Sequence, residues 1–314
     1  MVATSAAMTA TIELRGLTKW YGSIRAVDDI TAEVRPGQVT AFLGPNGAGK
    51  TTTLRMLLGL VAPTAGTSTI GGKRYDALRD PVRHVGAVLE TSGYHPGRTA
   101  LDHLRVLATA ARLAKGTPMR ALTDTGLGED ARRRVGAFSL GMRQRLGLAA
   151  AMLGDPAVLV LDEPTNGLDP EGIRWLRGYV RKLADDGRTV LVSSHALSEV
   201  EQTADHVLLI AKGRLIRSSA LAALRAEAGV GCRVRTPDPE RLSTMLAAAG
   251  YGVRLDGDEL AVDAAAEQVG ELAAMHRIVL HRLNPTARLE EAFFRITEQP
   301  GRPDEAHSFE SAPV

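Results

Sequence analysis

The sequence has little of what marks a secreted, membrane-spanning or disulfide-bonded protein. Cys232 is its only cysteine, so a disulfide within the chain is excluded and a reducing cytoplasm is the expected compartment. No uninterrupted apolar run in the sequence approaches the roughly 20 residues that a helix needs to cross a bilayer. Residues 1–11 lack the basic and apolar regions of a signal peptide and are expected to form a disordered leader.

Net charge and aromatic content are also low. The formal net charge is +2 over 314 residues, which is too small to argue for a nucleic-acid partner despite a pI of about 8.8. The hydrophobic share is 44%, as in globular proteins, and the length allows one large domain or two ordinary ones. If the chain works at a membrane, we expect it to do so through a partner.

Residues 44–52 have the pattern G-x-x-x-x-G-K-[ST] of a phosphate-binding loop. An apolar run of strand length, Val39–Leu43, precedes the loop, and leucines at helical spacing follow it from residue 52 to residue 60. Glycines let backbone N–H groups surround phosphate oxygens, and the start of the helix adds its dipole. A glycine-rich turn with an incidental lysine is the alternative. The expected nucleotide contacts are Gly44, Pro45, Asn46, Gly47, Ala48, Gly49, Lys50, Thr51 and Thr52.

Charged and hydroxyl side chains follow the apolar runs in this part of the chain. Lys50 is expected to contact the β- and γ-phosphates, and the hydroxyl of Thr51 to ligate Mg²⁺. The run Ala157–Leu161 ends in Asp162, expected to hold Mg²⁺, and Glu163, expected to orient or deprotonate the attacking water. A solvated strand end is the alternative for both carboxylates.

Four further segments have weaker signals. Asp169 lies in a tight turn, residues 165–170, and His195 ends a buried strand at residues 189–192, where it would contact the γ-phosphate or act as a surface residue or cap. Ser139 is well placed to cap the helix that follows it, and this helix start would equally suit a second phosphate site beside Gly141. Tyr21 is interpreted as an aromatic on a turn that stacks on a purine base, or as a residue at the edge of the core.

In order along the chain, these motifs resemble those of ABC transporter ATP-binding subunits. The resemblance covers about residues 12–216 and, through the segments at residues 85–90 and 139–146, is similar to bacterial drug-exporter subunits of the bacitracin-resistance kind. It implies an α/β P-loop NTPase (RecA-like) core with an antiparallel β subdomain and a helical insert at about residues 91–156. It also implies an ATPase at the cytoplasmic face of the inner membrane, peripheral and bound to a separate multi-span permease that exports a drug or other hydrophobic substrate.

The resemblance further implies a head-to-tail homodimer that holds two ATP molecules with Mg²⁺. Each ATP would lie between the phosphate loop of one subunit and Ser139 and Gly141 of the other. Glu163 would be the catalytic base, His195 would contact the γ-phosphate, and Asp169 would couple the subunits. The chain departs from the family pattern at Glu90, where a glutamine that meets Mg²⁺ is usual, and within the segment 138–142, which keeps Ser139 and Gly141.

The rest of the chain has a different organisation. Residues 12–17 and 32–34 are expected as short strands, and residues 96–153 as mostly helical, with Leu101, Leu104, Leu107 and Ala108 on one apolar face. Residues 217–229 are expected as a linker helix. Residues 230–297 follow a βαββαβ order, with a last strand at 278–283 and an amphipathic helix at 287–297, which predicts a small α+β ferredoxin-like accessory domain. Residues 298–314 are expected to be a disordered tail.

Two other classes of protein compete with the transporter interpretation. A soluble ABC-type switch acting on ribosomes or DNA is the main alternative, but the sequence has no second ATPase copy, long heptad insertion or zinc-spaced cysteines. A P-loop GTPase or kinase would not explain Asp162 and Glu163 after a buried strand, or the segment around Ser139.

Overall fold

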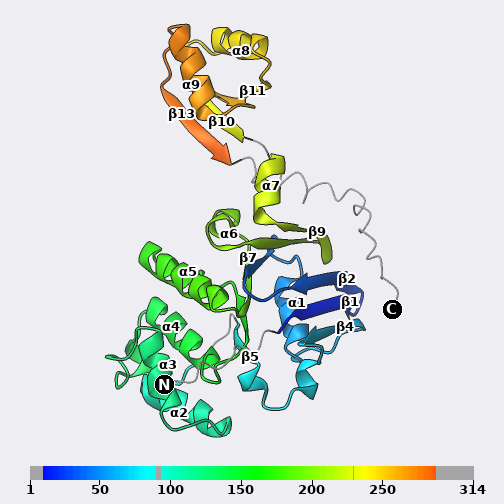
Figure 1. The fold of residues 1–314 in the computed structure, drawn as a ribbon, viewed down its shortest axis with the longest axis vertical. Coiled ribbons are helices and arrows are strands. Elements are labelled where there is room, and N and C mark those ends of the chain that lie inside the picture. The colour runs from blue at the N-terminus through cyan, green and yellow to red at the C-terminus, as the bar shows by residue number, and fades with distance from the viewer. Residues whose placement is uncertain (1–9, 90–92, 229, 288–314) are drawn as a thin grey trace. The chain divides into compact units, whose positions relative to one another are not determined.

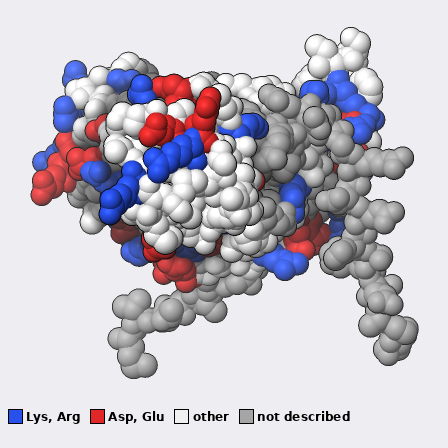
Figure 2. All heavy atoms as spheres, turned by 90° about the horizontal axis from the view of Figure 1, so that it is seen from above, with Lys and Arg blue, Asp and Glu red and all other residues white. Residues whose placement is uncertain are grey.

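The computed structural model describes residues 10–89, 93–228 and 230–287, drawn as ribbons in Figure 1. Within them the chain divides into two compact units, the first ending at Ser219 and the second beginning at Ala220. In the described part of the chain, no helix is both long enough and apolar enough to span a bilayer. On the face seen in Figure 2, Lys and Arg side chains lie among Asp and Glu side chains, in keeping with the low net charge.

A six-stranded sheet forms the centre of the first unit. Its strand order is β5-β6-β7-β3-β8-β9, and the pairs from β5 to β8 are parallel. Every residue of β3 and β6 is buried, because the sheet is covered on both faces, which explains their continuous apolar runs. The strands are β3 Val39–Leu43, β5 Val85–Val88, β6 Val158–Asp162, β7 Thr189–Ser194, β8 His206–Ala211 and β9 Arg214–Ala220.

A three-stranded antiparallel sheet precedes and flanks this core. It consists of β1 (Ile12–Tyr21), β2 (Ile24–Val34) and β4 (Ala65–Ile70), in the order β2-β1-β4. The bounds predicted for the two strands, residues 12–17 and 32–34, were wrong: β1 runs on to Tyr21, and β2 begins at Ile24, because Val27 and Ile30 are fully buried. Tyr21 therefore ends a strand, and the turn begins at Gly22, which has a φ of 58°.

Six helices complete the described part of the first unit. α1 follows the phosphate loop, and α2, α3 and α4 form the helical insert around a separate core cluster. In that insert Leu104 and Ala108 are buried as predicted, but Leu107 is 38% exposed, because it lies off the buried stripe of α2. The helices are α1 Lys50–Leu57, α2 Ala100–Ala110, α3 Thr117–Asp124, α4 Leu140–Ala151, α5 Pro170–Asp185 and α6 Leu197–Thr203, with 3₁₀ turns at Tyr75–Ala77, Pro81–Arg83 and Val135–Ala137.

An aromatic stack joins α4 to α5. The guanidinium of Arg145, on α4, lies 4.3 Å from the ring centre of Trp175, on α5. Trp175 in turn stacks on Tyr179 one turn further along α5, with ring centres 5.2 Å apart. Burial raises the pKa of Tyr179 to about 12, so this phenol stays neutral across the physiological range. The helix that starts at Ser139 is therefore anchored on the helix that starts at Asp169.

Two predicted boundaries of the first unit were wrong. The backbone oxygens of Ala10 and Thr11, assigned to the leader, accept hydrogen bonds from Thr189 Oγ1 at 2.6 Å and from Gly71 N at 2.8 Å. The expected linker helix starts later than predicted, because β9 continues to Ala220 at the edge of the sheet. The helix itself is α7 (Leu221–Ala228).

The second unit has the expected order of strands and helices. Its sheet order is β11-β12-β10-β13 with all neighbours antiparallel, and α8 and α9 contribute Leu242, Leu246 and Val269 to its core. The last strand lies four residues later than predicted, because Ile278 is buried at the end of α9 instead of pairing in the sheet. The elements are β10 Val230–Arg235, α8 Pro239–Ala248, β11 Val253–Asp256, β12 Glu259–Val262, α9 Ala266–Met275 and β13 Arg282–Ala287.

Three predictions about the end of the chain are not tested. The ferredoxin-like assignment of the second unit stays a prediction. The predicted helix at residues 287–297 continues past Ala287, the last described residue, and the predicted tail also lies outside the described residues.

Candidate nucleotide site

The loop between β3 and α1 has two positions where a side chain does not fit. Gly49 has a φ of 104°, and a Cβ there would lie 2.5 Å from the carbonyl oxygen of Ala26. A Cβ at Gly44 would lie 2.3 Å from the carbonyl oxygen of Ile210. Because neighbouring backbone comes this close, only glycine is accommodated at either position. The loop tip is exposed and consists of Pro45, Asn46 and Gly47, while Ala48 behind it is buried.

Helix α1 begins directly after Gly49, with Lys50, Thr51 and Thr52 in its first turn. No side chain caps this end of the helix, so its first N–H groups and the positive end of its dipole stay available to an anion. The sequence prediction of a strand, a glycine loop and a helix is confirmed, although the helix ends at Leu57 and not at residue 60. The arrangement is that of a phosphate-binding site.

Lys50 connects the loop to the carboxylate of Glu163. Its Nζ donates to the carbonyl oxygens of Gly44 at 2.7 Å and Pro45 at 3.3 Å, and lies 3.1 Å from Glu163 Oε1. The other carboxylate oxygen, Oε2, lies 2.8 Å from Nδ1 of His195. The side chains of Lys50 and Glu163 are only 6% and 10% exposed. The structure thus brings together a cation, a carboxylate and an imidazole, three residues that the sequence placed at the ends of separate elements.

Asp162 presents a carboxylate oxygen without a partner to the same edge of the sheet. Asp162 is 2% exposed, and its Oδ1 accepts a 2.6 Å hydrogen bond from Ser193 Oγ. Its Oδ2 is buried and has no hydrogen-bond partner among the described residues. A buried carboxylate oxygen left unpaired is costly unless a cation binds it. One carboxylate, one hydroxyl and phosphate oxygens are the donors that Mg²⁺ prefers, so Asp162 and Thr51 fit this ion.

Ser193 is a site residue that the sequence analysis missed. Its hydroxyl donates to Asp162 and accepts from the backbone N–H of Glu163 at 2.8 Å. Ser193 is fully buried at the end of β7, next to β6. Ser193 could have been predicted from the sequence, since it is a small hydroxyl residue at the carboxyl end of a buried strand. Parallel strands bring these ends together at one edge of the sheet.

The segment at the start of α4 lies apart from this cluster. Ser139 caps α4 as predicted, accepting a 3.2 Å hydrogen bond from Met142 N, and Ser139 is itself exposed. Its neighbours Leu140 and Gly141 approach Gly167 and Leu168, in the loop that leads to α5. Among the described residues, neither Ser139 nor Gly141 forms a hydrogen bond with Lys50. Asp169 caps α5, accepting a 2.7 Å hydrogen bond from Gly172 N.

Two predicted site residues remain to be placed. Tyr21 is 47% exposed at the end of β1, and the amine of Lys19 lies 5.1 Å from its ring centre. It is therefore not a core residue, and the Lys19 amine lies over one face of its ring. Glu90 lies outside the described residues, so its expected contact with Mg²⁺ stays a prediction.

Comparisons with known proteins match both units. A family model described as "ABC transporter" matches residues 27–166, and one described as "Domain of unknown function (DUF8746)" matches residues 231–290. The chain is 43% identical over 212 residues to the bacitracin transport ATP-binding protein of Bacillus licheniformis, covering 67% of this chain and 69% of that protein. It is 35% identical over 296 residues to the Nod factor export ATP-binding protein I of Burkholderia orbicola, covering 92% of this chain and 97% of that protein.

A solved structure gives the same result for the first unit. The dimeric structure of a bacterial ABC transporter cassette is 26% identical, has a TM-score of 0.60, and covers 67% of this chain and 98% of that one. The fold of the first unit and its sequence similarity therefore point to the same family.

Proposed function

Since the chain belongs to the ABC transporter ATP-binding proteins, which hydrolyse ATP to power transport, we propose that it is the ATPase subunit of a bacterial exporter. The cargo would be a drug or another hydrophobic compound, carried by a separate multi-span permease. Relatives named for transport of bacitracin and export of Nod factor support this proposal. The subunit would work at the cytoplasmic face of the inner membrane, held there by the permease.

The main support for ATP hydrolysis at this site is that both Lys50 and His195 contact the carboxylate of Glu163. We assign the phosphates of ATP to the loop from Gly44 to Thr52, where the helix dipole and the Lys50 ammonium offset their charge. When nucleotide binds, Lys50 exchanges the Glu163 carboxylate and two backbone carbonyls for phosphate oxygens. Glu163 is then free to accept a proton from the attacking water, as a general base.

We propose Mg²⁺ as the metal of this site, held by Asp162 and Thr51, with Glu90 as a further ligand. The unpaired, buried Oδ2 of Asp162 supports the assignment. When bound, the ion neutralises charge on the phosphates during transfer. Ser193 fixes the Asp162 carboxylate, and His195 contacts the γ-phosphate once Glu163 has released its imidazole.

We propose that two copies of the chain close head to tail around two ATP molecules. Ser139, Gly141 and Asp169 would then act across the interface, on the nucleotide held by the partner. The exposed, capped start of α4 supports this arrangement, as does the dimeric cassette of similar fold. Tyr21 would stack on the adenine, a contact of about 1–3 kcal/mol by analogy with other base stacking.

Co-purification tests the proposed function. The chain, tagged and expressed in a bacterial host with its permease, is expected to purify from detergent-solubilised membranes with that multi-span protein and to hydrolyse ATP. A matched preparation carrying Lys50→Ala controls for contaminating ATPases. Recovery with ribosomes or DNA in the absence of membranes would instead support the soluble switch.

A further inference from the structure

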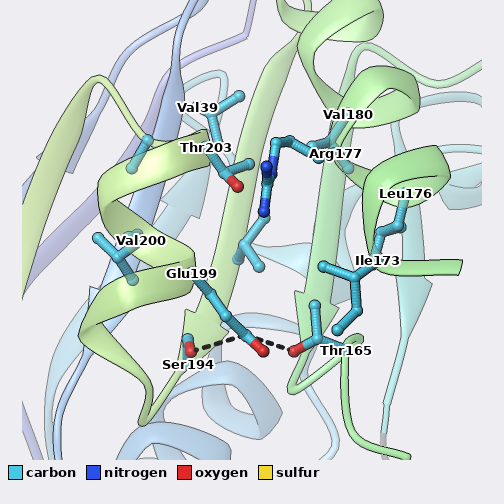
Figure 3. A pocket seen from close by; sticks show the side chains of 13 residues that line it. Val39, Thr165, Ile173, Leu176, Arg177, Val180, Ser194, Glu199, Val200 and Thr203 are labelled. Carbon is cyan, nitrogen blue, oxygen red and sulfur yellow. Dashed lines mark hydrogen bonds between the residues drawn. The ribbon is translucent and has the colours of Figure 1, made fainter. Parts of the chain in front are cut away.

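One carboxylate, that of Glu199, joins the two loops that carry Glu163 and His195. Glu199 lies in the first turn of α6. Its Oε2 accepts hydrogen bonds from Thr165 Oγ1 at 2.6 Å and from Ser194 Oγ at 3.4 Å, drawn as dashed lines in Figure 3. Thr165 comes two residues after Glu163, and Ser194 directly precedes His195. Among the described residues, neither hydroxyl forms a hydrogen bond with Lys50.

The surroundings of Glu199 strengthen these two hydrogen bonds. Its carboxylate lies at one end of a cavity of about 40 Å³ between α5, α6 and the sheet. Figure 3 shows apolar side chains around it, among them Ile173, Leu176 and Val200. In a largely apolar pocket a charged acceptor gains more from each hydroxyl than it does in water, and short bonds such as the one to Thr165 are typical.

Glu163 needs support from its neighbours to keep its backbone conformation. It has a φ of 48°, a left-handed value that costs a non-glycine residue about 1–3 kcal/mol and persists only where the surroundings impose it. Ser193 holds the backbone N–H of Glu163 on one side. Thr165, bound to Glu199, holds the chain on the other side. The second hydroxyl, of Ser194, also accepts the N–H of Ala196 at 3.0 Å, which fixes the backbone around His195.

We propose that Glu199 is a positioning residue for ATP hydrolysis. It sets the distance between the Glu163 carboxylate and the His195 imidazole by binding one hydroxyl from each loop, and it does not touch the nucleotide. The proposal rests on the proposed roles of Glu163 and His195. Because small misplacements of reacting groups cost about 100-fold in rate, a residue outside the phosphate site can control turnover in this way.

The experiment compares kcat, KM and ATP affinity in the full chain bound to its permease. Glu199→Ala is expected to lower kcat by about 10- to 100-fold, with the ATP dissociation constant within twofold of the unaltered chain. Glu199→Gln keeps an acceptor oxygen for Thr165 and is expected to recover most of the lost kcat. Ser198→Ala, one residue earlier on an exposed side of α6, is the matched control and is expected to leave both values unchanged.

A second variant separates positioning from general loss of structure. Thr165→Val removes one hydroxyl while keeping the shape of the side chain, and is expected to give part of the kcat loss. Combined with Glu199→Ala it is expected to add nothing, because both changes remove the same hydrogen bond. If Glu199→Ala does not fold, Thr165→Val decides: unchanged kcat in this variant overturns the proposal.

Other outcomes are equally decisive. The proposal is overturned if Glu199→Ala folds and keeps kcat within twofold, or if only its ATP affinity falls. If Glu163→Gln is inactive while Glu199→Ala is active, this inference fails and the proposed function stands. If the unaltered complex does not hydrolyse ATP, or Glu163→Gln hydrolyses it equally well, both fail together.

Discussion

Replacing Glu163 by Gln tests the exchange of partners at Lys50 most directly. The variant keeps the size and shape of the side chain and removes its charge. In the structure the ammonium of Lys50 lies 3.1 Å from Glu163 Oε1, and both side chains are almost fully buried. Nucleotide binding has to break this pair before Lys50 reaches a phosphate. The variant is therefore expected to bind ATP more tightly while it loses hydrolysis.

The size of both effects follows from the contacts. In the variant the Lys50 ammonium faces a neutral amide instead of a carboxylate, so the attraction between opposite charges is lost while a contact with the ammonium remains possible. Compared with the range of about 1.5–3 kcal/mol for interactions with charged groups, we expect the competing interaction to fall by about 1 kcal/mol. At about 1.4 kcal/mol per factor of ten, ATP affinity rises about fivefold. Loss of a general base lowers turnover by about 10²- to 10⁴-fold.

Three measurements check this expectation on the purified chain. Equilibrium titration with ATP gives the affinity, phosphate release gives the turnover, and size-exclusion chromatography with light scattering gives the oligomeric state. The variant is expected to accumulate as a dimer with saturating magnesium ATP. Glu171→Gln removes an exposed carboxylate from the first turn of α5 and is the matched control, with all three values unchanged.

Two results would refute the reasoning. Turnover within tenfold of the unaltered chain would remove Glu163 from the role of base. ATP binding weaker than in the unaltered chain would mean that Lys50 and Glu163 do not compete with nucleotide. A variant that stays monomeric with excess magnesium ATP would leave the pocket intact but contradict the proposed dimer.

Further expectations concern the loop, its lysine and a buried histidine. Lys50→Ala is expected to lower phosphate release by at least about 10²-fold, and substantial residual turnover would remove Lys50 from the catalytic set. Gly49→Ala is expected to introduce about 2 kcal/mol of backbone strain and so to lower the melting temperature by about 4–8 °C. Gly178→Ala, at an exposed position of α5, is the control and is expected to raise the melting temperature slightly. Equal shifts in the two variants would contradict the role of the loop geometry. Burial lowers the pKa of His103 in the folded chain, and the charge of Arg98 lowers it further. Below about pH 6.5 the unfolded chain therefore binds a proton more readily than the folded chain, so the free energy of unfolding decreases as the pH falls. His103→Gln is expected to flatten this fall between pH 7.5 and 5 in thermal unfolding, and exposed His276→Gln is expected not to.

The sequence was sufficient for the phosphate site because its signals are local. Lys50 follows a glycine loop between a strand and a helix, and Asp162 and Glu163 end a buried strand. In a parallel sheet such strand ends meet at one edge, so the sequence was enough to predict that Glu163 lies near Lys50, although not their contact distance. The family resemblance drawn from these motifs is confirmed.

Other features depend on tertiary contacts that the sequence does not display. The bond between Thr165 and Glu199 spans 34 positions and depends on how α6 packs on the sheet. Strand β2 begins at Ile24 and not at residue 32, because burial of Val27 and Ile30 against the core outweighs the low strand propensity of Asp28 and Asp29. At Ile278 the prediction was wrong in the other direction. Its apolar side chain indicated a strand, but the residue packs after the end of helix α9.

The stack of Arg145, Trp175 and Tyr179 limits how helices α4 and α5 can move relative to each other. A guanidinium on an indole face resists separation but permits sliding, because the attraction depends on distance to the ring and only weakly on lateral position. The stack therefore opposes any movement that would pull α4 away from α5, while it leaves the two helices free to slide along each other.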